Sequence, residues 1–213
     1  MTRLDIISDF VCPWCYLGKR NLETAIAARG AHPFAIRWHP FQLDPSIPPE
    51  GLPRQAYLEA KLGGPERVAA AHGRLEAMGA EAGITFQFDR ITRAPNTLDA
   101  HRLTRWAAAE ERQTLVATEL FRRYFEEGED ISDPAVLMAA ADAAGLDPAP
   151  VARLLAGDAD RAEVLAEIED AGRIGVTGVP TFLVGGRYAI SGAQPAETWG
   201  QVMDEIDAAT PDA

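Results

Sequence analysis

The sequence LDIISDFVCPWC, residues 4–15, leads an apolar run directly into two cysteines three positions apart. Residues 3–8 are apolar enough for a buried strand. Pro13 suits the first position of a helix, with Cys12 as the residue that caps it. The stretch therefore predicts a strand that turns into a helix at the cysteine pair.

The residues that follow complete a strand-helix-strand unit. Gly30 is favourable just beyond a helix end, so the helix is expected to run to about Arg29. The sequence FAIRWH, residues 34–39, favours a second strand. The cysteines then lie where the first strand of a βαβ unit meets its helix.

Further along the chain, a long helical stretch precedes a second β region. From about residue 54 to residue 174 the pattern is helical, and no strand is expected there. Residues 181–184 and 187–190 then favour two strands around a Gly-Gly pair, which supplies the positive φ values of a tight hairpin turn. A last helix is expected over about 195–208.

Composition excludes several classes of partner. The 213-residue chain carries 20 basic and 32 acidic residues, a net charge of -12. Nucleic acid and anionic membranes repel such a surface, so neither is expected as a partner.

Met1 leads almost directly into the first strand without the pattern of a signal peptide, and a cytoplasmic location is expected. No apolar run is long enough to span a bilayer.

The two cysteines, Cys12 and Cys15, favour redox chemistry. A disulfide scaffold needs more cysteines, and a zinc site usually shows a second pair or closely spaced histidines. We therefore expect no metal. Side chains three apart on a helix bring their β-carbons within about 5–6 Å, and a disulfide needs Cα atoms about 4.4–6.8 Å apart. Reversible closure of the pair is thus possible with little backbone movement.

The two sulfurs are expected to have different roles. Cys12 lies where unpaired N–H groups and the positive end of the helix dipole favour a thiolate. Pro13 has no N–H, so Trp14 and Cys15 are expected to supply the donors. Cys15, one turn further on, should be more shielded. Cys12 is therefore expected to attack a disulfide and Cys15 to resolve the mixed disulfide.

The sequence resembles the DsbA family of the thioredoxin superfamily, through Cys-Pro-Trp-Cys after the first strand and Val-Pro-Thr at 179–181 before the third. The resemblance implies an α/β thioredoxin fold, a mixed four-stranded sheet, with a large all-helical insertion. It also implies a cis Val179–Pro180 bond beside Cys12. The backbone of Val179 would then pair with an extended substrate, so Val179 and Pro180 are expected substrate-binding residues.

The resemblance is narrower for the FrnE-like branch of DsbA-type proteins, which is similar over essentially the whole chain. It rests on Ser8-Asp9-x-x-Cys-Pro-Trp-Cys-Tyr, on Asn-Thr-x-x-Ala-His-Arg-Leu at 96–103, and on Gly-Ala-Gln-Pro at 192–195. On this basis residues 1–45 form the N-terminal βαβ part of the thioredoxin-like domain, 46–174 the helical insertion, and 175–213 the C-terminal ββα part.

The resemblance implies thiol-disulfide exchange with protein or peptide substrates, with a thiol reductant to recycle the pair and no bound cofactor beyond the Cys12–Cys15 disulfide. Glutathione is expected at most as a reductant.

The neighbouring branch of 2-hydroxychromene-2-carboxylate isomerases and kappa-class glutathione transferases offers a rival function. There a serine commonly replaces the first cysteine, and a Ser-Asp-Arg stretch stands where this chain has residues 193–195. A non-catalytic peptide-binding chaperone is a second rival. The oligomeric state stays open.

Other side chains near the motif have weaker signals. Trp14 is expected at the surface, as an apolar contact for substrate. His101 could lean over the active site as a substrate contact, although a lone helical histidine is more often packed or exposed. Asp9 is expected to hydrogen-bond in the turn rather than to act on Cys12. Asn96 is expected to cap a helix.

Overall fold

The computed structural model describes residues 1–209 and begins with the predicted strand-helix-strand unit. Strand β1 (Thr2–Ser8) leads into helix α1 (Pro13–Arg29), which Gly30 ends in the left-handed conformation with φ 78°. Strand β2 (Phe34–Pro40) then lies parallel to β1, with Leu4 opposite Ile36. The helix therefore begins at Pro13 and ends before Gly30, as the sequence predicts.

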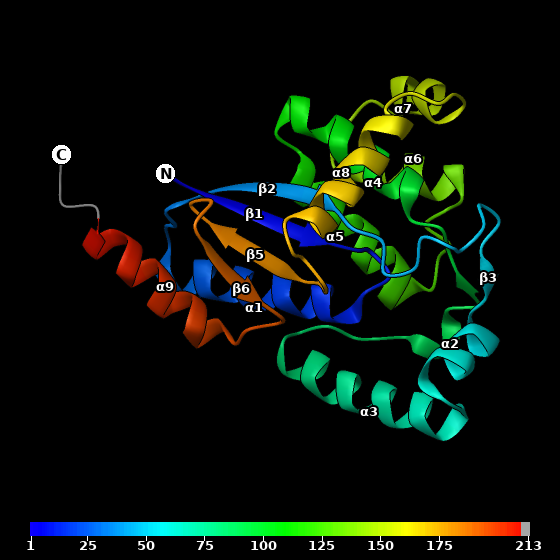
Figure 1. Cartoon of the computed structure of the whole chain (residues 1–213), viewed down its shortest axis with the longest axis horizontal. Coiled ribbons are helices and arrows are strands. Elements are labelled where there is room, and N and C mark those ends of the chain that lie inside the picture. Colours follow the sequence, from blue (N-terminus) through cyan, green and yellow to red (C-terminus); the bar gives the residue numbers. More distant parts are fainter. Residues whose placement is uncertain (210–213) are drawn as a thin grey trace.

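Two further strands complete a four-stranded sheet in the order β2-β1-β5-β6. Strand β5 (Thr181–Val184) is antiparallel to β1, and β6 (Tyr188–Ser191) is antiparallel to β5. Gly185 and Gly186 make the turn between them with φ values of 60° and 68°, as the hairpin signal predicts. The mixed four-stranded sheet of the thioredoxin fold is thus confirmed (Figure 1).

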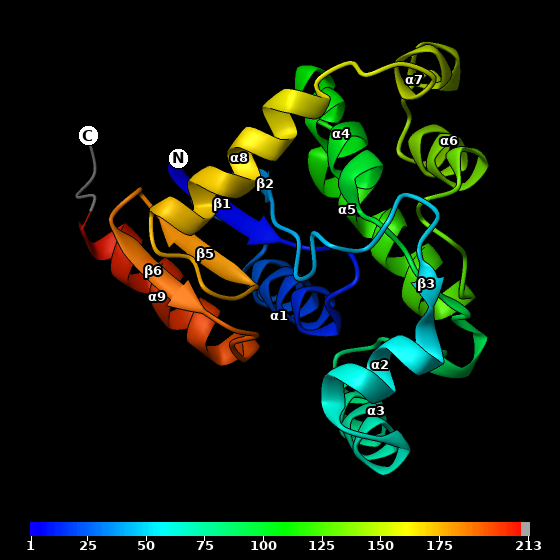
Figure 2. The same cartoon turned by 45° about the vertical axis from the view of Figure 1, so that its right-hand side comes forward.

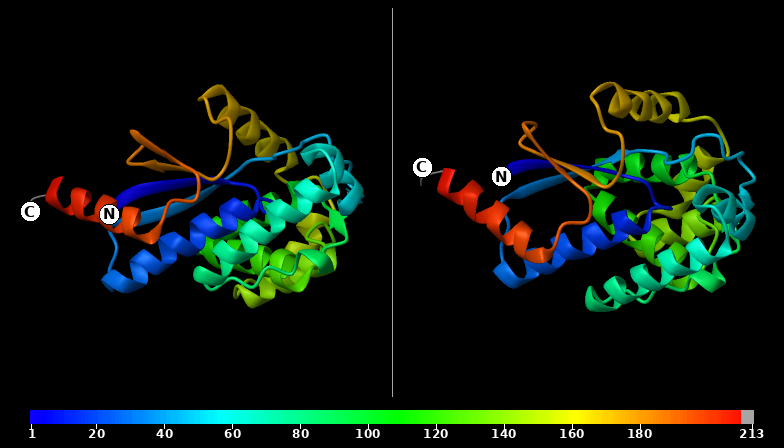
Figure 3. Two further views of the ribbon diagram at one scale, coloured as in Figure 1. Left: turned by 90° about the horizontal axis from the view of Figure 1, so that it is seen from below. Right: turned by 60° about the horizontal axis from the view of Figure 1, so that its bottom comes forward.

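The sheet is covered on both faces. Helices α1 and α9 (Ala196–Ala209) lie together on one face, and α8 (Arg161–Arg173) crosses the other (Figure 3). Under α9, the rings of Phe182 and Trp199 meet edge to face at 4.7 Å between centroids. On α8 the buried residues are Val164 and Ala171. The neighbouring Leu165 is exposed.

The remaining helices form the block between β2 and β5. Figure 2 shows α2 and α3 as a pair on one side and α4 to α7 on the other. In the part of the chain that the structure describes, no helix is long and apolar enough to cross a membrane. The bounds are α2 (Arg54–Leu62), α3 (Pro65–Glu81), α4 (Leu98–Trp106), α5 (Gln113–Arg122), α6 (Pro134–Ala143) and α7 (Pro148–Leu155), with short 3-10 turns at Phe88–Arg90 and Ala107–Glu110 and a π turn at Arg123–Glu127.

One prediction for this block is wrong, because a strand does occur within it. Strand β4 (Arg93–Ala94) pairs antiparallel with β3 (Leu52–Pro53) in a separate two-stranded sheet. Two residues are too few to show the alternating pattern that reveals a strand. The insertion is therefore helical apart from this short ladder.

The helical block packs against both α1 and the edge of the sheet. Tyr16 of α1 stacks on Phe121 of α5, with ring centroids 5.2 Å apart and planes 4° apart. At the outer edge of β2, the carboxamide of Gln113 accepts from the Trp38 N–H at 3.2 Å and donates to the Trp38 carbonyl oxygen at 3.4 Å. The block and the sheet thus share one core, while the division at residues 45 and 174 stays a prediction.

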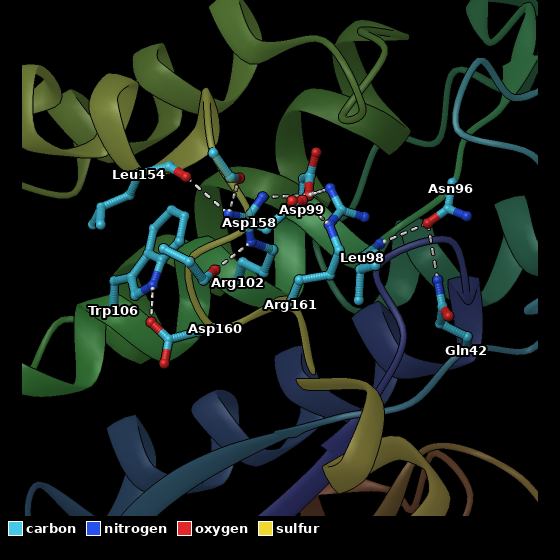
Figure 4. Close-up of polar contacts among 12 residues, drawn as sticks. Gln42, Asn96, Leu98, Asp99, Arg102, Trp106, Leu154, Asp158, Asp160 and Arg161 are labelled. Atoms are coloured by element: carbon cyan, nitrogen blue, oxygen red, sulfur yellow. Dashed lines mark hydrogen bonds and ion pairs between the residues drawn. The ribbon is translucent and has the colours of Figure 1, made fainter. Parts of the chain in front are cut away.

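A buried arginine holds the connection between α7 and α8. Arg102 of α4 is fully buried and donates to the carbonyl oxygens of Ala159 at 2.7 Å, Leu154 at 2.8 Å and Gly157 at 2.6 Å. It also donates to Asp99 at 2.8 Å. Figure 4 shows this guanidinium among its partners, with the Asn96 side chain capping the Leu98 N–H nearby.

We expect Arg102→Met to lower the free energy of unfolding by about 3–5 kcal/mol, because removing one member of a buried charged network leaves its partners unpaired. Chemical denaturation at neutral pH measures this loss. Arg161→Met is the control, since its side chain is 37% exposed and binds the same Asp99; it should cost less than about 1 kcal/mol. Equal losses for both variants would contradict the role given to Arg102.

Candidate functional site

The cysteine pair lies at the first turn of α1. Cys12 is the capping residue, with φ -90° and ψ 110°. Its N–H donates to the Asp9 carbonyl oxygen at 3.1 Å, and its own carbonyl oxygen accepts from the Cys15 N–H at 3.0 Å. Both cysteines are free thiols, 3% and 1% exposed. The Cys15 N–H is therefore engaged within the first turn, contrary to its expected role as a donor to the Cys12 sulfur.

The loop before β5 meets the Cys12 sulfur. The Val179–Pro180 peptide bond is cis, and the Cys12 thiol donates to the Val179 carbonyl oxygen at 3.6 Å. Thr181 fixes the loop by donating from its hydroxyl to the Gly178 carbonyl oxygen at 2.8 Å. The structure thus brings together Cys12, Val179 and Pro180, which the sequence places 167 residues apart.

A glycine in α1 permits this approach. A β-carbon at Gly18 would lie 3.2 Å from Pro180 Cγ and 3.3 Å from Phe182 Cζ, closer than most real contacts of a β-carbon. A larger residue would force the side chains of Pro180 and Phe182 to shift beside the contact between Cys12 and Val179. The sequence offered no signal for Gly18, because it stands inside a helix without a turn to explain it.

The second thiol has a different environment. Burial raises the pKa of Cys15 well above its ordinary value, and the hydrogen bond and charge of Cys12 raise it further. The Ser8 hydroxyl and the Asp9 N–H act in the opposite direction on the same pKa. Cys15 is therefore a neutral thiol at rest, which suits the partner that waits for a mixed disulfide to form.

Trp14 is half-buried between the two cysteines and packs against the core. It is less exposed than the surface position expected for it, because the ring lies along the core rather than extending into solvent. One part of the side chain stays accessible beside the pair. Its proposed contact with substrate therefore involves only that accessible part.

His101 lies behind the strand-to-helix loop, not over the sulfurs. It is 4% exposed, and its Nε2 lies 2.9 Å from the Phe41 carbonyl oxygen and 3.6 Å from Asp9 Oδ1. Its ring packs against Phe10 at 4.9 Å between centroids. Asp9 in turn accepts from the Leu43 N–H at 2.8 Å. These contacts give His101 and Asp9 a supporting role. The Asp9 side chain bonds the distant Leu43 rather than its own turn, where the Asp9 carbonyl oxygen accepts from the Cys12 N–H.

Two cavities flank the site. One of about 710 Å³ follows β2 and includes His101 and Ser8 in its wall, but neither cysteine. Another, of about 360 Å³, lies along the loop from Ile174 to Thr181 and the neighbouring faces of β5 and β6. The smaller cavity is the one beside Val179 and Pro180. Within residues 1–209, no three His, Cys, Asp or Glu side chains are grouped to hold a metal ion.

Comparisons with known proteins agree with this geometry. Residues 3–204 match the model of the DsbA-like thioredoxin domain. A probable DsbA oxidoreductase from Streptomyces coelicolor is 32% identical and superposes with a TM-score of 0.85, covering 100% of this chain and 93% of that one.

Two more distant structures share the fold. The cytosolic disulfide reductase DsbM from Pseudomonas aeruginosa, solved with GSH, is 20% identical with a TM-score of 0.69 over 96% of this chain and 98% of that one. A 2-hydroxychromene-2-carboxylate isomerase is 19% identical with a TM-score of 0.68, over 96% and 95% of the two chains.

We expect a small alkylating reagent at neutral pH to modify Cys12 before Cys15. The reason is that burial keeps the Cys15 thiol neutral, while Cys12 lies at the helix terminus, and the thiolate is the reactive form. Peptide mass spectrometry of the reduced protein after short exposures measures the order. Unfolding in denaturant is the control, because the preference should then disappear. Equal labelling of both thiols in the folded protein would contradict the assignment.

Proposed function

Since this chain belongs to the family of DsbA-like thioredoxin domains, we propose that it is an oxidoreductase that exchanges disulfides with protein or peptide substrates through Cys12 and Cys15. The observation that carries the proposal is the asymmetry of the pair. Both thiols are buried, but Cys12 caps the N-terminus of α1 beside the Val179 carbonyl oxygen, whereas Cys15 lies one turn inside the helix, where burial raises the pKa of its thiol.

The first step is attack by the Cys12 thiolate on a substrate disulfide. One substrate sulfur becomes bonded to Cys12, and the other leaves as a thiolate that takes a proton from solvent. The positive end of the α1 dipole favours the attacking thiolate. The carbonyl oxygen of Val179 accepts from the Cys12 thiol at 3.6 Å in the resting protein, and this hydrogen bond is given up when the sulfur attacks.

The second step releases the substrate. Cys15 attacks the Cys12 sulfur, the bond to the substrate sulfur breaks, and the Cys15 proton finally resides on the departing thiol. The products are a reduced substrate and the Cys12–Cys15 disulfide. An external thiol then returns the pair to the dithiol form, and we propose glutathione in this role, as reductant and not as bound cofactor.

Substrate recognition is proposed to use the loop before β5. The backbone of Val179 is placed to pair with an extended segment next to the reacting sulfur, a form of strand addition. The accessible part of Trp14 offers an apolar contact on the other side of Cys12. Main-chain pairing of this kind accepts many sequences, which suits an enzyme that acts on several proteins.

We expect the protein to reduce insulin in the presence of a thiol donor. Cys12→Ser should abolish this activity, because the attacking sulfur is lost. Cys15→Ser should still form mixed disulfides but release them slowly, so covalent adducts should accumulate on non-reducing gels. Turbidity of the precipitating insulin chain measures the rate. A non-catalytic chaperone would show no activity with any of the three proteins.

A glutathione-dependent isomerase or transferase is the second candidate, favoured by the fold shared with the isomerase and with a reductase solved with GSH. Two features of this chain speak against it. Cys12 stands where the rival branch commonly has serine, and residues 193–195 lack the Ser-Asp-Arg stretch. Calorimetry of glutathione with Cys12→Ser separates the two candidates, since micromolar binding together with isomerisation of an aromatic substrate would favour the rival.

The redox potential is expected to lie between those of thioredoxin and DsbA, about -270 and -120 mV. The helix terminus stabilises the thiolate and raises the potential, whereas Pro13 lacks a donor and the Cys15 N–H is engaged by the Cys12 carbonyl. Equilibration against glutathione buffers, followed by thiol trapping, measures it. A potential at or below the thioredoxin level would refute this placement.

With such a potential, the dithiol should be the resting form in the cytoplasm that we propose as the location. The support for that location is the name of one fold neighbour, a cytosolic disulfide reductase. The protein would then reduce or reshuffle disulfides produced by oxidants. Thiol trapping in unstressed cells measures the fraction of the Cys12–Cys15 pair that is reduced. A fully oxidised pair would contradict this role.

A further inference from the structure

Two buried polar atoms without hydrogen-bond partners occur in consecutive residues just before the redox motif. Among the described residues, neither Ser8 Oγ nor Asp9 Oδ1 has a hydrogen-bond partner. Both residues are only 1% exposed. Buried polar groups are nearly always paired in folded proteins, so an unpaired hydroxyl at this place calls for an explanation.

The strand directs the Ser8 side chain toward α1. Side chains alternate between the faces of a strand, so Ser8 shares its face with Leu4 and Ile6. Both of those residues belong to the core that packs against α1. Ser8 is the last residue of β1, at the level where α1 begins. Its hydroxyl therefore lies beneath the first turn of the helix, on the side of Cys15.

Near the Ser8 hydroxyl, Cys15 is the group whose charge changes during disulfide exchange. At rest it is a neutral thiol, and a buried thiol is a weak acceptor that leaves the Ser8 hydroxyl poorly satisfied. During resolution the sulfur becomes a thiolate in a place that water does not reach. Burial raises the pKa of Cys15, and a hydrogen bond from the Ser8 side chain and another from the Asp9 N–H lower it.

We propose that the Ser8 hydroxyl is the side-chain donor that stabilises the Cys15 thiolate while it attacks the mixed disulfide. The inference rests on the proposed function, since it concerns the second step of disulfide exchange. In that step the Cys15 sulfur bonds to Cys12, the bond from Cys12 to the substrate sulfur breaks, and the substrate thiolate takes the proton that Cys15 gave up. The Ser8 hydroxyl keeps its own proton throughout.

This role explains why the hydroxyl is unpaired in the resting protein. A donor already bound to a carbonyl oxygen would have to break that bond before it could serve the thiolate. A donor held in place by the strand, with no competing acceptor among residues 1–209, needs no such rearrangement. The Asp9 N–H supplies the second donor from the backbone, so substitution of Ser8 leaves one donor in place.

The test separates the two steps with dithiobis(nitrobenzoate), an aromatic disulfide that releases one coloured thiolate when Cys12 attacks and another when Cys15 resolves. Stopped-flow absorbance of the reduced protein should show two phases. In Ser8→Ala the first phase should stay within about twofold, and the second should slow by about 10-fold or more, as expected for the loss of a hydrogen bond to a charged group. The pH midpoint of the second phase should move upward.

Matched variants exclude a merely structural effect. Ser8→Thr keeps the hydroxyl on a side chain that strands accept, whereas Ser8→Val has the same shape without it. The first should behave like the native protein and the second like Ser8→Ala. Thr104→Ala is the control for loss of a buried hydroxyl elsewhere, because the Thr104 hydroxyl donates within its own helix to Ala100 at 2.9 Å; both phases should be unchanged.

Several outcomes would overturn the inference. It fails if Ser8→Ala and Ser8→Val resolve as fast as the native protein, or if both phases slow equally. It fails as well if Ser8→Thr slows the second phase as much as Ser8→Val does. A native protein that releases only one thiolate would instead refute the proposed function itself, because Cys15 would then not resolve the mixed disulfide.

Discussion

The close approach of α1 to the loop before β5 is the constraint on which the site depends. Gly18 leaves room for Pro180 and Phe182 where a β-carbon would touch both. Because of that contact, the start of the helix and the Val179 carbonyl oxygen meet at the Cys12 sulfur. The rest of the sheet holds these two segments in place, with β1 delivering the cysteines and β5 delivering the loop.

The helical block is built onto this arrangement through shared packing. Tyr16, one residue after the pair, stacks on Phe121, so the redox helix and the insertion are parts of one core. His101 and Asp9 hold the loop at Phe41 and Leu43 against the back of the motif. Movements of the insertion relative to the sheet would therefore disturb the geometry of the cysteines, and a rigid connection keeps the first turn of α1 in position for both steps.

Local signals made much of the fold predictable from the sequence. Pro13 and Gly30 bound the helix, and two glycines define the hairpin, because each of these residues has few backbone alternatives. What could not be predicted depends on distant contacts. The two-residue strand β4 shows no pattern of its own. The burial of His101 and the lack of a hydrogen-bond partner for Ser8 both depend on segments that are far apart in the sequence and meet only in the folded protein.

The way Gln113 covers β2 has a consequence for how copies of this protein can associate. Its carboxamide occupies the N–H and the carbonyl oxygen of Trp38, the groups that an added strand would need. In the described chain the strand order makes β2 and β6 the two edges of the sheet, and the glutamine blocks the β2 edge at Trp38. A particle with open edges on both sides can add neighbours without end, whereas one with a single open edge stops at a pair. The capped Trp38 therefore interrupts the ladder that a strand added beside β2 would need, which hinders edge-to-edge addition on that side.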